Sequence, residues 1–90
     1  MAWAVRLESR AEKDLGRLDR QDAQRILLYL HERVANLDDP RSIAEAMKGE
    51  FTGLWKFRVG SYRILAEIRA EEILVLVARI GHRSKIYGGH

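Results

Sequence analysis

The stretch LWKFRVGSYR, residues 54–63, predicts a β-hairpin. Apolar and basic side chains alternate along it, as on a strand with one buried face. The pair Gly60-Ser61 suits a two-residue turn, because glycine at the first central position supplies the positive φ of a type II′ turn. This turn sets the register, which pairs Val59 with Tyr62, Arg58 with Arg63, Phe57 with Ile64 and Lys56 with Leu65.

The two faces of the predicted hairpin differ in chemistry. One carries the expected core side chains Trp55, Phe57, Val59, Tyr62 and Ile64, and the other carries Lys56, Arg58 and Arg63. Opposed like charges repel, so folding alone gives no reason to place two arginines opposite each other. Three cations with no carboxylate nearby favour a phosphate-binding surface, because guanidinium groups bind phosphate oxygens in pairs and stabilise transition-state charge. An ordinary solvent-exposed face is the alternative.

The flanking sequence predicts an α+β fold. Residues 3–8 alternate like a strand, Ser9 and Glu12 have capping-box spacing before a first helix, and a second helical period runs from Asp19 to Leu37. Residues 41–53 are either a short helix or an irregular edge strand ending at Gly49. Strands follow at 62–69 and 72–80, the second an interior strand covered on both faces. The expected order is β-α-α-β-β-β, with two N-terminal antiparallel helices packed on one face of a small, mainly antiparallel sheet. The position of the first strand stays open.

Composition limits the classes of protein that fit. Ninety residues, 47% apolar and 32% charged, suit one domain spanning residues 1–90. The chain has neither an apolar run of about 20 residues nor the pattern of a signal peptide, so we expect a cytoplasmic protein with no membrane association. Cysteine is absent, and His31, His82 and His90 lack metal-site spacing. The first 47 residues carry a net charge of −1 and the rest carry +4, which places the basic excess in the C-terminal half.

The order of these motifs resembles the RelE branch of the RelE/ParE toxin superfamily. The resemblance covers nearly the whole chain and includes Trp3, Val5, Ala11, Leu15 and Leu18. Its most specific part is the RVGSYR hairpin (residues 58–63) combined with the late pattern HRxxxY (residues 82–87). It implies a small antiparallel sheet with two N-terminal helices. It also implies the toxin of a type II toxin-antitoxin system, a ribosome-dependent messenger-RNA endonuclease that works without a metal or cofactor.

The resemblance also implies roles for individual residues. Lys56 matches a basic residue that is a candidate to activate the ribose 2′-hydroxyl, Arg58 matches the second basic residue, and Arg63 would bind the scissile phosphate. Arg83 would stabilise transition-state charge, and Tyr87 would stack on a nucleobase or join the proton transfer. His82 and Lys85 are additional candidates for substrate binding. The reaction would be attack by the 2′-hydroxyl on the adjacent phosphorus, which leaves a 2′,3′-cyclic phosphate and a free 5′-hydroxyl.

The implied partners are a cognate antitoxin and the 70S ribosome with messenger RNA in its A site. Operator DNA would be bound only through the antitoxin complex. The alternative is a ParE-like toxin of the same fold, which poisons DNA gyrase and cleaves no RNA. A plain RNA-binding module or an inactive family member is a third possibility.

Overall fold

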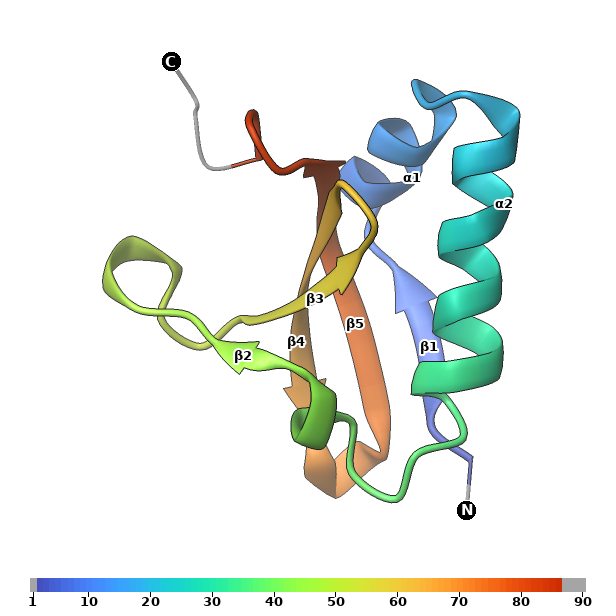
Figure 1. Cartoon of the computed structure of the whole chain (residues 1–90). Helices are drawn as coiled ribbons and strands as arrows, with labels where there is room; N and C mark the ends of the chain where they lie inside the picture. Colours follow the sequence, from blue (N-terminus) through green and yellow to red (C-terminus); the bar gives the residue numbers. More distant parts are fainter. Residues whose placement is uncertain (1, 87–90) are drawn as a thin grey trace.

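A five-stranded sheet with two helices on one face forms the architecture of residues 2–86, which are the residues that the computed structural model describes (Figure 1). The helices are α1 (Ser9–Gly16) and α2 (Arg20–Leu28), and a π-helical turn (Tyr29–Val34) continues α2. The strands are β1 (Ala4–Leu7), β2 (Glu45–Ala46), β3 (Trp55–Val59), β4 (Tyr62–Arg69) and β5 (Leu74–His82). The α+β class and the placement of both helices between the first two strands are confirmed.

The strand order is β1-β5-β4-β3-β2. All neighbouring pairs are antiparallel except β1 and β5, which run parallel with Ala4 opposite Leu74. The first strand, whose position the sequence left open, therefore lies at an edge. The interior position predicted for the strand after residue 72 is confirmed, although β5 begins and ends two residues later than expected. A short 3₁₀ turn (Ala70–Glu72) and Ile73, with φ of 50°, occupy its expected start.

The hairpin has the predicted register, from Val59 opposite Tyr62 to Lys56 opposite Leu65. Gly60 has the positive φ that the turn requires, 59°. Phe57, Val59 and Ile64 are buried in the core, and Tyr62 packs against it. The core assignment of Trp55 was wrong: its side chain is only partly buried, because it lies where β3 pairs with the two-residue edge strand β2.

The helices contribute Ala11, Ile26, Leu30 and Val34 to the core. The predicted capping box was wrong, because Ser9 is already helical and Glu8 is the N-cap residue, with no side-chain cap hydrogen bond. Asp19 does precede α2 as its N-cap residue. The helical segment ends at Val34, earlier than the predicted Leu37.

Residues 41–53, for which the sequence predicts either a short helix or an irregular edge strand, contain short pieces of both. This segment consists of a 3₁₀ turn (Pro40–Ile43), the edge strand β2 and a second 3₁₀ turn (Gly49–Phe51). This edge strand carries Glu45 to a position opposite Lys56. None of the helices within residues 2–86 has the length and apolar character needed to span a bilayer.

Candidate functional site

Three of the predicted site residues lie on one face of the β3–β4 hairpin. Arg58 and Arg63 are direct cross-strand partners, and Lys56 lies two residues before Arg58 on the same face. The backbone N–H of Arg83 donates to the carbonyl of Ser61 at 2.8 Å, which ties the segment after β5 to the turn. We call Lys56, Arg58 and Arg63 the basic hairpin face. The fold thus brings the backbone of Arg83, distant in sequence, to the hairpin turn.

The two opposed arginines have different environments. The Arg58 side chain is 64% exposed and extends into solvent. Arg63 turns back over the hairpin, where its Nη1 donates to the carbonyls of Gly60 at 3.1 Å and Tyr62 at 3.0 Å. These hydrogen bonds hold one side of the Arg63 guanidinium in place. A guanidinium held in this way loses less conformational entropy when it binds an anion.

A carboxylate lies on the basic hairpin face, so the prediction of three cations with no carboxylate nearby was wrong. Glu45 Oε1 lies 3.2 Å from Lys56 Nζ and 3.5 Å from Arg58 Nη2. The hydrogen bond from Lys56 and its charge, with a smaller contribution from Arg58, lower the pKa of Glu45 below its usual range. The only signal in the sequence was an acidic residue in a segment of uncertain structure, and a strand of two residues has no readable periodicity.

His82 and Lys85 lie away from the basic hairpin face. His82 pairs with Tyr62 in the β4–β5 register, and the two rings meet edge to face with centroids 5.9 Å apart. His82 Nδ1 accepts a hydrogen bond from the backbone N–H of Ser84 at 3.2 Å and contacts its hydroxyl at 2.8 Å. Both His82 and Lys85 line a separate pocket of about 390 Å³ that also contains Asp14, Arg17 and Arg79. Tyr87 lies outside the described residues.

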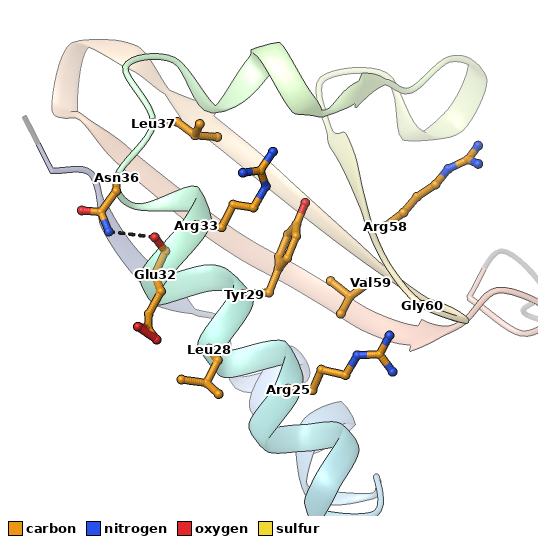
Figure 2. A pocket seen from close by; sticks show the side chains of 10 residues that line it. All are labelled: Arg25, Leu28, Tyr29, Glu32, Arg33, Asn36, Leu37, Arg58, Val59 and Gly60. Atoms are coloured by element: carbon orange, nitrogen blue, oxygen red, sulfur yellow. Dashed lines mark hydrogen bonds between the residues drawn. The ribbon is translucent and has the colours of Figure 1, made fainter.

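An open groove of about 650 Å³ lies between β3 and the helical wall formed by α2 and the π-helical turn that follows it. Figure 2 shows the side chains that line this groove. Arg25, Tyr29 and Arg33 contribute side chains from the helical wall, and Arg58, Val59 and Gly60 form the strand wall. Burial is the main cause that raises the pKa of the Tyr29 hydroxyl, although nearby Arg33 opposes the shift. Sequence reasoning missed Arg25 and Arg33, although their spacing of four residues on either side of Tyr29 places all three on one helical face.

The guanidinium of Arg25 closely approaches the hairpin turn. A Cβ atom added to Gly60 would lie 2.6 Å from Arg25 Nη2, so the glycine leaves room for this cation as well as adopting the turn conformation. The turn is therefore surrounded by positive charge from α2, β3, β4 and the segment after β5. Such an arrangement attracts polyanions. Glu45, which pairs with Lys56 and Arg58, adds a carboxylate that can accept a proton.

Comparisons with known proteins agree with this architecture. The family model described as "ParE toxin of type II toxin-antitoxin system, parDE" matches residues 5–87. Toxin RelG of Mycobacterium tuberculosis is 26% identical over 87 residues, which cover 97% of this chain and 98% of that protein. A chain of the M. tuberculosis toxin-antitoxin complex RelBE2 superposes with a TM-score of 0.85 at 24% identity, over 94% of this chain and 95% of that one. The isolated E. coli RelE toxin superposes with a TM-score of 0.68 at 20% identity, over 96% and 92% of the two chains.

Proposed function

Because the chain belongs to the RelE/ParE superfamily of type II toxins, on its RelE-like branch, we propose that it is a ribosome-dependent endonuclease of messenger RNA. The observation that carries this proposal is the direct opposition of Arg58 and Arg63, with the segment of Arg83 hydrogen-bonded to the same turn. Their repulsion is relieved when a phosphate group lies between them.

The proposed reaction is attack by a ribose 2′-hydroxyl on the adjacent phosphorus. Arg63 binds the scissile phosphate, Arg58 and Lys56 add positive charge beside it, and Arg83 stabilises the charge that develops in the transition state. Tyr87 stacks on a nucleobase or takes part in proton transfer. His82 and Lys85 contact a flanking part of the RNA from their separate pocket. The ribosome aligns the message in its A site, which supplies the orientation that so open a surface lacks.

A cognate antitoxin is the proposed partner in the cell. This proposal is supported by the toxin-antitoxin complexes among the similar structures, from M. tuberculosis, E. coli, Pyrococcus horikoshii and Methanococcus jannaschii. A segment with carboxylates would neutralise the basic hairpin face and compete with RNA for it. Binding to operator DNA would occur through the antitoxin in that complex.

Poisoning of DNA gyrase, which the resemblance implies for a ParE-like toxin, is the second candidate function, and the match to a family model of ParE toxins keeps it in view. It would require a protein-binding surface but no phosphate-binding constellation. The basic hairpin face with neighbouring Arg83 therefore favours RNA cleavage.

A reconstituted translation system tests both candidates. Purified protein is added to ribosomes stalled with a defined codon in the A site, and the 5′ ends of the message are mapped. Cleavage within the A-site codon that produces 5′-hydroxyl ends is the expected result. Intact message together with inhibited supercoiling by purified gyrase would replace the first proposal with the second.

A further inference from the structure

The chain forms a compact turn directly after β5, and His82 makes most of the hydrogen bonds that hold it. The His82 carbonyl accepts from the backbone N–H groups of Lys85 at 2.9 Å and Ile86 at 3.0 Å. His82 Nδ1 accepts from the backbone N–H of Ser84 at 3.2 Å and lies 2.8 Å from the Ser84 hydroxyl. Both the backbone and the ring of His82 therefore fix the chain on the C-terminal side of Arg83.

The ring of His82 is in turn held against the body of the protein. It meets Tyr62 edge to face, with centroids 5.9 Å apart. The Tyr62 hydroxyl donates to Asp22 Oδ2 of α2 at 2.8 Å. A series of contacts thus leads from α2 through both rings to Ser84, and it gives the His82 ring a defined orientation toward the turn.

Ile86 closes the other end of this turn. Its side chain is 7% exposed, although the residues from His82 to Lys85 are exposed. A Cβ atom added to Gly81 would lie 3.3 Å from Ile86 Cβ, so the glycine allows Ile86 to pack closely on the end of β5. The turn is therefore anchored at both ends.

The stability of the fold offers little explanation for the hydrogen bonds of the His82 ring, because exposed hydrogen bonds contribute little. Their effect on geometry is larger. The backbone N–H of Arg83 donates to the carbonyl of Ser61 at 2.8 Å, so this turn and the hairpin turn fix the Arg83 backbone from two directions. A cationic side chain that starts from a fixed backbone loses less conformational entropy when it binds an anion.

We propose that His82 is a positioning residue for Arg83, because its Nδ1 shapes the turn from which the Arg83 side chain reaches the RNA phosphate. This inference rests on the proposed function and gives His82 a role besides its contact with RNA. Since Nδ1 faces Ser84, Nε2 is the ring nitrogen available to RNA. Bonding from a side chain to the N–H two residues later is also the geometry of an Asx turn, in which asparagine supplies the acceptor.

Two substitutions separate the acceptor of His82 from its ring. His82→Asn places Oδ1 where Nδ1 was and removes the ring, whereas His82→Phe keeps a ring beside Tyr62 and removes the acceptor. At saturating ribosome concentration, single-turnover cleavage should fall by about 10²-fold in His82→Phe, the cost of a misplaced group, and His82→Asn should retain most of the rate. A lost contact between Nε2 and RNA would instead raise the half-saturating concentration in both variants.

His31 provides the matched controls, because it is an exposed histidine on the π-helical turn that follows α2. His31→Phe and His31→Asn should cleave like the unchanged protein. Thermal melts and co-sedimentation with ribosomes should show that each variant folds and binds. His82→Ala, which also lacks the acceptor, replaces His82→Phe in every measurement if the latter does not fold.

A double-mutant cycle shows whether His82 acts through Arg83. Arg83→Ala should lower the saturating rate by about 10² to 10³-fold, as removal of a transition-state donor does. Addition of His82→Phe to Arg83→Ala should cause almost no further loss, because the guanidinium that His82 positions is already absent. A purely structural role of His82 would give losses that multiply.

The inference would be overturned by a full rate in folded His82→Phe, by equal losses of saturating rate in His82→Phe and His82→Asn, or by losses that multiply in the double variant. A full rate in Arg83→Ala would overturn it as well. In each of these outcomes the unchanged protein still cleaves messenger RNA, so the proposed function stands. Absence of cleavage by the unchanged protein would remove the proposed function and this inference together.

Discussion

Arg58 on β3 and Arg63 on β4 are direct cross-strand partners, and the Arg63 guanidinium donates back to the carbonyls of the turn between them. Removal of the Arg63 side chain should therefore change two quantities by different amounts, the rate of RNA cleavage and the free energy of unfolding. Arg63→Ala should lower single-turnover cleavage by about 10² to 10³-fold, as removal of a transition-state donor does. It should cost no more than about 1.5 kcal/mol of stability, because only hydrogen bonds near the surface are lost. Measurement of both quantities on one preparation checks the prediction, and near-normal cleavage by folded Arg63→Ala would remove the residue from the site.

The aromatic residues of β3 should respond differently to truncation. Phe57 is fully buried and meets Tyr29 edge to face at 6.5 Å, so Phe57→Ala should cost about 3 to 5 kcal/mol in the free energy of unfolding. Trp55 is only partly buried beside the short strand β2, and Trp55→Ala should cost clearly less. Urea denaturation of both variants tests this order. A larger loss in Trp55→Ala would show that the end of β3 contributes more to the core than its burial indicates.

Asp14 should contribute more to stability than an ordinary surface carboxylate. It accepts hydrogen bonds from the backbone N–H of Ile80 at 3.0 Å and from Arg79 Nε at 2.9 Å. Both donors lie after Val77, the last residue of β5 that pairs with β1. Asp14→Ala should therefore cost about 1 to 3 kcal/mol, because a backbone donor and an arginine lose their acceptor together. Exposed Glu12 on the same helix is the control, and Glu12→Ala should have a smaller effect in the same denaturation experiment. Equal losses in the two variants would contradict this role of Asp14.

The Tyr62 hydroxyl should make stability sensitive to alkaline pH. It donates to Asp22 Oδ2 at 2.8 Å, and this hydrogen bond, with burial and the charges of Asp22 and Asp19, raises the pKa of Tyr62. A raised pKa favours the protonated hydroxyl in the folded state, so its contribution is fully present below about pH 10 and is lost as pH rises through the folded-state value. The stability difference between the unchanged protein and Tyr62→Phe should stay constant between about pH 7 and pH 9 and shrink above about pH 10. Urea midpoints across this series test it, and a difference that grows with pH would have the wrong sign.

Local sequence rules predicted the hairpin in detail, because its register follows from a two-residue turn and strict alternation. The same rules could not find Glu45, since the two-residue strand β2 exists only through its pairing with β3. They also grouped His82 and Lys85 with the other cations. This grouping fails because neighbours in sequence near a strand end can face different sides of a sheet. The pairing of His82 with Tyr62 decides its side, and that pairing depends on a register shift near Leu65 and Ala66 that no sequence pattern revealed.

The parallel pairing of β1 with β5 has a consequence for biosynthesis. Ala4 has no sheet partner until Leu74 has been made, and β5 must enter between β1 and β4, both of which precede it in the chain. A chain that stops before Leu74 would leave each of these strands with an unpaired edge, a condition that promotes aggregation. It would also lack the backbone hydrogen bond that brings Arg83 to the hairpin turn. The cationic surface around the hairpin turn is therefore complete only after the segment from Leu74 to Arg83 has been synthesised and has folded against both strands.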